Sequence, residues 1–262
     1  MSATSPAVDA PNLPAATLLT DRAIVRLSGD DVAGFLQSLL SNDVAGPLPC
    51  YAALLSPQGK CQFDMLVWAD PAGGADMLID VERARADMLV RKLALYRLRR
   101  SIQIGVDDSI GVHWALEGVA GAKHDPRLAA LGHRWLAENP DGDAPPSCNI
   151  NANAAWRVHR LSLGVAEGMA ELGDASLLWL ECNAAELHGV SFTKGCYVGQ
   201  ENTARMNWRQ KVNRRLVVLP IADADAKRQL FAYVDLGLTL DHRRVEDIPP
   251  HGWRDWMREG AL

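Results

Sequence analysis

The sequence lacks the features that mark membrane and secreted proteins. It contains no run of about 18 apolar residues, so we expect no transmembrane helix. No basic stretch followed by an apolar one opens the chain, and its first arginine, Arg22, comes after two aspartates, so neither a secretory signal nor an arginine-rich transit peptide is expected. We therefore expect a cytoplasmic protein with a flexible leader over residues 1–17, which are rich in Ala, Pro and Ser.

Cysteine is scarce, and its spacing is irregular. The five cysteines, at positions 50, 61, 148, 182 and 196, form no CxxC pair. This argues against a disulfide framework, a zinc knuckle and a ligand set for a resident iron–sulfur cluster, so we expect no metal site. Basic residues are outnumbered by acidic ones, and the net charge is −5. Neither nucleic acid nor an acidic membrane is therefore expected as the main partner.

Several common catalytic motifs are absent. No HExxH, GxSxG or P-loop occurs, which argues against a zinc hydrolase, an α/β-hydrolase and a P-loop nucleotide hydrolase. No GxGxxG follows a predicted strand, so a dinucleotide site is not indicated. Cys196 with His188 or His159 would supply a nucleophile and a base. The sequence does not place them together, so this pair stays open as an alternative.

The 262 residues are 48% hydrophobic and 23% charged, as in ordinary globular proteins of one large or two modest domains. The predicted elements run strand, helix, several strands with a hairpin, helix and strand, an order typical of an α+β fold rather than a parallel doubly wound sheet. We predict strands at 22–27, 51–55, 62–68, 76–81, 101–106, 110–116, 216–220 and within 230–240, helices at 31–40, 82–98, 126–136 and 201–208, and either type at 155–163.

The most unusual stretch is residues 194–201, with the sequence KGCYVGQE. It combines two glycines and a cysteine with lysine, glutamine and glutamate, which fits neither an amphipathic helix nor a buried strand. Glycines permit backbone conformations that other residues avoid, so a cysteine between them is a candidate reactive thiol. A glycine-rich surface loop with a charged end is the simpler interpretation.

This stretch resembles the K-G-C-Y-x-G-Q-E signature of the YgfZ/Iba57 family. Members of that family are folate-binding proteins of iron–sulfur cluster assembly or repair, related to the glycine cleavage aminomethyltransferase. Further blocks of the sequence resemble the family in the same order, at 27–30, 35–37, 41–44, 56–60, 63–64, 181–183 and 189–192. The resemblance spans roughly residues 20–218.

The resemblance implies an α+β, aminomethyltransferase-like folate-binding fold with a ferredoxin-like region and a small C-terminal β-barrel-like subdomain. Residues 18–210 would form the folate-binding part and residues 211–262 the C-terminal subdomain. The implied function is that of an accessory factor, more than a turnover enzyme. It would bind tetrahydrofolate and support assembly or repair of iron–sulfur enzymes, with client enzymes or assembly proteins as partners.

The resemblance also implies roles for individual residues. Cys196 would be the functional thiol, with a pKa lowered by Lys194 or by a helix start. The remaining signature residues would shape its loop, three residues would lie on the pterin side of a folate cavity, and basic residues would meet the glutamyl tail. These are Lys194, Gly195, Tyr197, Gly199, Gln200 and Glu201 in the loop, Asn42, Asp43 and Asp64 at the pterin, and Arg97, Arg99 or Arg205 at the tail.

Two departures from the family pattern qualify these expectations. Ser162 stands where relatives often carry a glutamate that contacts the pterin, and a hydroxyl cannot supply the charge-assisted hydrogen bonds of a carboxylate. Only about 45 residues follow Arg215, too few for a complete barrel, so the C-terminal subdomain is expected to be curtailed.

Two other functions stay open. A folate-dependent one-carbon transferase would use Asp64 as its activating carboxylate, and the serine at position 162 argues against it. A non-catalytic interaction protein would use the signature as a partner surface.

Overall fold

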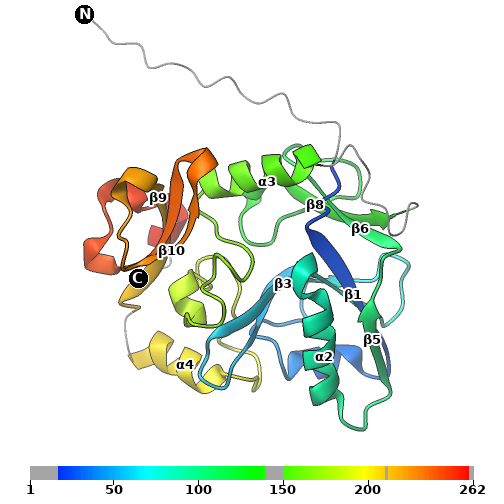
Figure 1. Ribbon diagram of the computed structural model, residues 1–262. Helices are drawn as coiled ribbons and strands as arrows, with labels where there is room; N and C mark the ends of the chain where they lie inside the picture. The colour runs from blue at the N-terminus through cyan, green and yellow to red at the C-terminus, as the bar shows by residue number, and fades with distance from the viewer. Residues whose placement is uncertain (1–16, 140–149, 210–211, 260–262) are drawn as a thin grey trace, which may run out of the picture.

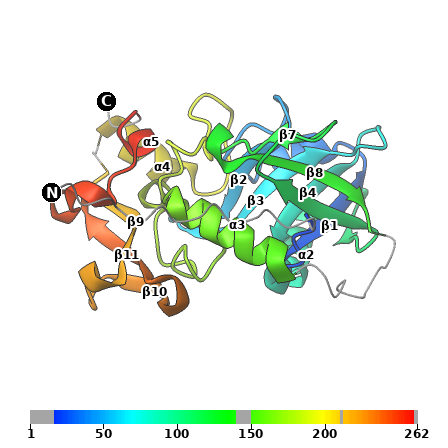
Figure 2. The same cartoon turned by 90° about the horizontal axis from the view of Figure 1, so that it is seen from above.

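A computed structural model describes residues 17–139, 150–209 and 212–259. Most of the predicted leader, Cys148 and the boundary predicted near residue 210 lie outside these residues. Figure 1 shows a large sheet on the right, C-terminal strands on the left and helix α3 (Ile150–Ser162) running between them, and the view from above in Figure 2 shows the same arrangement. The interval at 155–163, which the sequence left open, is therefore helical.

The large sheet has five antiparallel strands in the order β2-β3-β4-β1-β5. Its helices α1 and α2 follow β1 and β4, so the chain runs in the β-α-β-β-α-β order of a ferredoxin-like unit with β2 as one additional edge strand. The elements are β1 (Arg22–Gly29), α1 (Val32–Gln37), β2 (Cys50–Leu55), β3 (Cys61–Ala69), β4 (Met77–Glu82), η1 (Arg83–Arg85), α2 (Ala86–Arg97) and β5 (Ile102–Val106).

Both faces of this sheet are buried. Helix α2 covers one face with Leu89 and Leu93, which join the same core as Val25 and Met65. The other face belongs to a second and larger core. Because both faces are covered, the strand sequences are nearly continuous apolar runs, and a charged residue inside one of them is an exception.

A second sheet of three strands, in the order β6-β8-β7, packs on the larger core. The helix predicted at 126–136 is wrong. Its apolar residues repeat at helical spacing, but Gly132 adopts a φ of +87° and ends a short turn, after which the chain continues as a strand paired with β6. The elements are β6 (Ile110–Ala115), β7 (Lys123–His124), η2 (Ala129–Leu131) and β8 (His133–Glu138).

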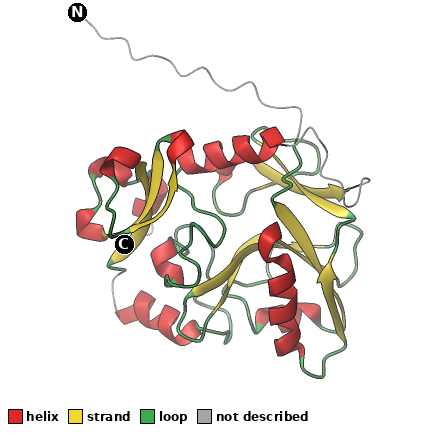
Figure 3. Ribbon diagram, viewed as in Figure 1, coloured by secondary structure: helices red, strands yellow, loops and turns green. Residues whose placement is uncertain are grey.

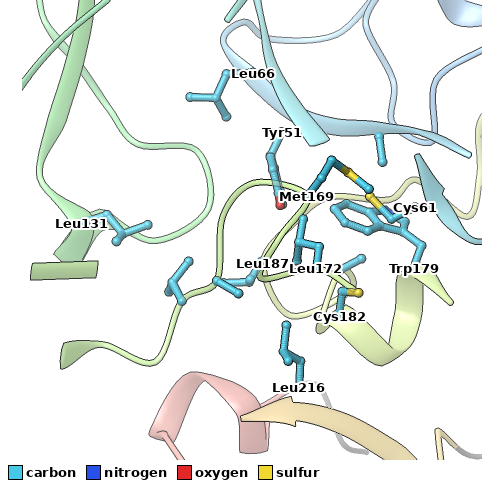
Figure 4. Packing of buried hydrophobic residues seen from close by; sticks show 14 of the residues in the cluster. Tyr51, Cys61, Leu66, Leu131, Met169, Leu172, Trp179, Cys182, Leu187 and Leu216 are labelled. Atoms are coloured by element: carbon cyan, nitrogen blue, oxygen red, sulfur yellow. The ribbon is translucent and has the colours of Figure 1, made fainter. Parts of the chain in front are cut away.

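The segment from residue 163 to residue 199 has little regular structure beyond the short helix η3 (Trp179–Cys182), as Figure 3 shows. It nevertheless supplies much of the larger core. In Figure 4, Met169, Leu172 and Trp179 from this segment lie between Tyr51 of β2 and Leu216 of the C-terminal part. This segment therefore joins the large sheet to the C-terminal strands.

The C-terminal part forms a three-stranded antiparallel sheet in the order β10-β11-β9. The barrel-like subdomain that we expected is not seen, because these three strands close no barrel within residues 212–259. Among the described helices, none is both long and apolar enough to cross a membrane. The elements are α4 (Gln200–Arg209), β9 (Arg214–Pro220), η4 (Ile221–Asp223), β10 (Gln229–Tyr233), η5 (Val234–Leu236), β11 (Leu238–Arg244), η6 (Val245–Asp247), η7 (Pro250–Gly252) and α5 (Asp255–Glu259).

Candidate functional site

The signature loop is tied to the chain segment that follows α1. The Lys194 ammonium donates hydrogen bonds to the backbone oxygens of Leu40, at 2.6 Å, and Asn42, at 2.8 Å. Its Nζ also lies 5.1 Å from the centre of the Tyr197 ring. Burial lowers the pKa of Lys194 to about 8. Lys194 therefore acts as an anchor of the loop.

Tyr197 and Val198, which follow Cys196, each contact one of the two cores on either side of the loop. Tyr197 is buried in the larger core, and Val198 packs against the core beneath α1 and α2. Gln200 and Glu201 then open helix α4, on which Arg205 is exposed. The loop is thus held by apolar contacts on both sides, between its lysine anchor and a helix.

The thiol of Cys196 lies at the exposed part of this loop. Cys50, Cys61 and Cys182 are buried, so Cys196 alone is exposed among the four cysteines that the structure describes. Beside it, a methyl group added at Gly195 would meet no atom within 4 Å. Within the described residues, no hydrogen bond or ion pair joins Lys194 to the thiol, since its ammonium is bonded to backbone oxygens.

The proposed cysteine–histidine pair is not formed in the described part of the chain. The His159 ring bonds to the backbone oxygen of Ala130 at 2.8 Å. His188 is exposed, and its backbone oxygen accepts a hydrogen bond from Asn42. Neither imidazole forms a hydrogen bond with Cys196, so these two residues supply no base to that thiol within the described part of the chain.

The second glycine of the signature packs closely against the turn between β2 and β3. Gly199 has a φ of +83°, and a methyl group there would lie 2.5 Å from the backbone oxygen of Ser56. The Asn202 side chain donates to the backbone oxygen of Gln58 at 2.8 Å. Three sequence blocks far apart in the chain, at 40–43, 56–60 and 191–203, therefore meet in space.

We expect Gly199→Ala to lower the free energy of unfolding by about 2 kcal/mol, because a side chain is strained at this φ and would collide with the Ser56 carbonyl group. Gly195→Ala is the matched control, since its methyl group would enter open space. Chemical denaturation of both variants measures the difference. Equal stability of the two would show that the loop does not rest on the turn as described.

The residues predicted at the pterin have structural partners. The Asn42 amide donates to the backbone oxygens of Tyr51, at 2.8 Å, and His188, at 2.7 Å. Asp43 accepts hydrogen bonds from the Gln37 side chain, at 2.9 Å, and from the backbone of Ala45, at 3.0 Å. These bonds fix the backbone beside the Lys194 anchor, and a ligand role for Asn42 and Asp43 stays a prediction.

A cavity of about 500 Å³ lies elsewhere, between the large sheet, helix α3, the segment 167–171 and strand β10. Neither the signature residues nor Asn42, Asp43, Asp64 or Arg205 line it. Trp156 and Tyr233 supply aromatic surface. Eight of the fifteen lining residues are charged, namely Asp21, Arg22, Glu82, Arg83, Arg157, Arg160, Glu167 and Glu171.

Six buried charged side chains form an ion network in and behind the wall of this cavity. Three arginines face three carboxylates, so the charges balance, and the groups come from β1, β4, β8 and two loops. The network therefore fastens the second sheet and the segment after α3 onto the large sheet. Its members are Arg22, Arg127 and Arg134 with Asp80, Asp125 and Glu167.

Glu167 and Arg22 are the members of the network that line the cavity. The Glu167 Oε2 accepts hydrogen bonds from Arg127, at 2.7 Å, and Arg134, at 2.9 Å, while its Oε1 accepts one from the Trp156 indole at 2.9 Å. Burial alone would raise the pKa of Glu167, but Arg134, Arg22 and Arg127 hold it well below its usual value. Glu167 is therefore a buried anion that orients its neighbours.

Asp64 lies beside this network but forms no ion pair with a described residue. It is buried on β3, and its Oδ2 is 3.4 Å from the Tyr51 hydroxyl and 3.5 Å from the backbone nitrogen of Gly168. Burial raises its pKa to about 6, with Arg22 opposing and Glu167 adding to the shift. Since Gly168 lines the cavity, Asp64 lies directly behind the cavity wall.

Comparison with known proteins decides the family. The human mitochondrial iron–sulfur cluster assembly factor IBA57 is 31% identical over 235 residues, which span 78% of this chain and 66% of that protein. The mitochondrial IBA57 homologue of Mycosarcoma maydis, also an iron–sulfur cluster assembly factor by name, is 32% identical over 222 residues, 76% of this chain and 55% of its own length.

The chain belongs to the IBA57 family. It spans between about half and two thirds of the length of these relatives. Their names place the relatives in mitochondria, whereas the cytoplasmic location of this chain stays a prediction. No family model matches the chain.

The fold of this IBA57 family member resembles that of an aminomethyltransferase. The glycine cleavage system aminomethyltransferase T from Bartonella henselae superposes with a TM-score of 0.63 over 89% of this chain and 80% of that chain. The two share 11% sequence identity, so the likeness concerns the fold alone. The predicted aminomethyltransferase-like α+β fold is confirmed at this level.

Sequence reasoning missed the cavity residues of this IBA57 chain. Ser162, taken as the substitute for a pterin-binding glutamate, is exposed, donates to the His159 backbone oxygen at 2.7 Å and does not line the cavity. The carboxylates that line the cavity are those of Asp21, Glu82, Glu167 and Glu171. The sequence did contain one signal, Arg22, a charged residue directly before three apolar residues at the start of a strand.

Proposed function

We propose that this IBA57 family member is an accessory factor in the assembly or repair of iron–sulfur clusters, with the Cys196 thiol as the group that meets the partner. The observation that carries the proposal is the exposed position of this one thiol on a loop held by Lys194, Tyr197 and Gly199. The names of the relatives support cluster assembly as the process.

The loop suits this role because it presents a thiol without burying it. A thiolate is the form of cysteine that ligates iron or attacks a disulfide. Burial would raise the pKa of a thiol, as it does for Cys50, whose pKa is raised to about 12. An exposed thiol on an anchored loop keeps a fixed place on the surface, where a partner can reach it. In this proposal the iron–sulfur cluster is cargo and not a resident cofactor of this chain. The partner protein carries it before or after the two proteins meet.

We expect Cys196→Ala to abolish rescue of iron–sulfur enzyme activity in a strain that lacks the endogenous factor, while leaving the unfolding temperature unchanged. Gly195→Ala is the control, because it alters the neighbouring residue and keeps the thiol. Client enzyme activity in cell extract is the measurement. Full rescue by Cys196→Ala would overturn the proposal.

We further propose that the cavity beside Glu167 holds a folate-type ligand. Its volume lies in the range of small-molecule sites. Glu82 lines it and, among the described residues, accepts one hydrogen bond, from the backbone of Met169 at 3.0 Å, so its carboxylate can also accept from the N–H edge of a pterin. Among the described residues, the buried Nε atoms of Arg157 and Arg160 have no hydrogen-bond partner, and both arginines line the cavity.

These residues fit the ligand. Glu82 would hold the pterin and Arg157 an anionic group, and a bound tetrahydrofolate would supply a carrier for one-carbon units. None of Arg97, Arg99 and Arg205 lines this cavity, and Arg97 donates to the backbone oxygen of Ile102 at 3.0 Å, so their role at the glutamyl tail stays a prediction.

Calorimetric titration of the purified protein with tetrahydrofolate tests this assignment. We expect Glu82→Gln and Arg157→Met each to weaken binding by about tenfold, the loss of one charge-assisted hydrogen bond. Ser162→Glu is the control, because it adds a carboxylate outside the cavity, and we expect no gain in affinity. Absence of binding by the wild-type protein would overturn the assignment without affecting that of Cys196.

The one-carbon transferase remains a second candidate, and one observation favours it. The pKa of Asp64, near 6, suits a group that accepts and returns a proton at neutral pH. A purely non-catalytic interaction protein would show neither folate binding nor a requirement for Asp64, yet would lose partner binding when Cys196 is replaced.

A further inference from the structure

The outer face of helix α2 carries an unusual concentration of positive charge. Residues 83–100 hold seven of the 27 lysines and arginines of the chain and only one of its 32 acidic residues. The rest of the chain is correspondingly acidic. The fold does not need all of these cations, because within the described residues Arg91, Lys92 and Arg99 take part in no ion pair.

The same face exposes large apolar side chains. Met88 is 44% and Leu95 is 72% exposed, and Leu98, just after the helix, is 85% exposed. Met88, Arg91, Lys92 and Leu95 follow the spacing i, i+3, i+4 and i+7, so they form one stripe along the helix. The opposite stripe, with Leu89 and Leu93, already holds the helix on the sheet.

A groove runs beside this stripe, with a volume of about 560 Å³. Phe63, Met88 and Leu95 supply apolar surface, and Arg85, Arg91 and Lys92 supply positive charge. The Arg85 guanidinium lies 5.3 Å from the centre of the Phe63 ring, so it covers an aromatic face at the groove while its charge stays available. Its ion pair, with Asp174 at 3.5 Å, is at the surface, where such pairs contribute little.

We propose that this α2 groove is the docking site for an acidic, amphipathic segment of a partner protein. Apolar side chains of the segment would enter between Phe63, Met88 and Leu95, as in helix-in-groove recognition. Its carboxylates would meet Arg85, Arg91 and Lys92, which complement their charge and speed the encounter.

The chemistry of the groove favours a protein over a nucleic acid or an acidic membrane. Phosphate backbones are bound by tracks of cations, whereas here the two cations of the stripe, Arg91 and Lys92, lie between the apolar side chains of Met88 and Leu95. The inference is independent of the role proposed for Cys196, which lies on a different loop.

The test uses a fluorescent amphipathic peptide with leucines at positions i, i+3, i+4 and i+7 and glutamates elsewhere, and measures its fluorescence anisotropy with the full chain. We expect binding that Arg91→Glu with Lys92→Glu weakens by more than about tenfold and Leu95→Ser by about fivefold. Lys123→Glu with Lys227→Glu is the matched control, since it makes the same charge change at two exposed positions elsewhere. We expect this control to alter affinity by less than about twofold.

If the control pair weakened peptide binding as much as the groove pair, the change in net charge alone would explain the loss of affinity, and the proposal would be overturned. An absence of peptide binding, or equal binding of a peptide with alanine in place of leucine, would also overturn it. Phosphatidylserine vesicles and a single-stranded oligonucleotide serve as competing probes. If either binds the full chain through Arg91 and Lys92 more tightly than the peptide, the groove is not a protein-docking site. Unchanged unfolding temperatures of the variants exclude loss of folding as the cause.

Discussion

Glu167→Gln is expected to lower the free energy of unfolding by about 3–5 kcal/mol, the cost of removing one partner from a buried ion pair. The substitution keeps the shape of the side chain and removes its charge. Arg127 and Arg134, both buried, would then share two carboxylates with Arg22, and a positive charge would be left without compensation. Denaturation by urea at neutral pH measures the loss.

Glu246→Gln is the matched control for this prediction. Glu246 pairs with Arg244 at 3.1 Å, but the two side chains are 72% and 54% exposed, so the loss should stay below about 1 kcal/mol. A comparably small loss for Glu167→Gln would mean that the network is hydrated and does not fasten the segment after α3 to the two sheets.

The large sheet was predictable from the sequence because its signals are local. Apolar runs, a Pro-Gln-Gly-Lys turn and a helical apolar spacing each lie within about ten residues, the range over which periodicity is informative. The prediction failed at 126–136 for a local reason as well, since leucines at helical spacing hid the break at Gly132. The family resemblance then identified three blocks that the structure brings together around Lys194 and Gly199.

The cavity and its ion network were not predictable in the same way. Arg22 and Glu167 are 145 positions apart in the chain, and only the packing of the segment after α3 against the large sheet brings them near each other. The sequence does indicate which strands contain buried charges. Asp64 and Asp80 interrupt apolar strands, and a buried charge must find a partner or shift its pKa. Asp80 forms ion pairs with Arg22 and Arg134, whereas Asp64 forms none with the residues that the structure describes.

Replacement of this unpaired carboxyl group gives the last prediction. Asp64→Asn is expected to raise the free energy of unfolding at pH 7 by up to about 3 kcal/mol, because ionisation of a buried group is costly. The pKa of Asp64 is about 6 in the folded chain and 3.8 ordinarily, so the folded protein holds this proton more tightly than the unfolded one. The stability that the neutral carboxyl group contributes is complete below pH 3.8 and is lost as the pH rises through about 6.

The variant should therefore differ little from the wild-type protein near pH 4 and exceed it in stability at pH 7. Asp108→Asn is the control, since Asp108 is 47% exposed, and its effect should stay within about 0.5 kcal/mol at both pH values. A stability gain that does not depend on pH would contradict the raised pKa.

A carboxylate that lowers stability at neutral pH is expected to be kept for function. If Asp64→Asn still rescues iron–sulfur enzymes fully, the one-carbon transferase is excluded and the accessory role of Cys196 stands without it.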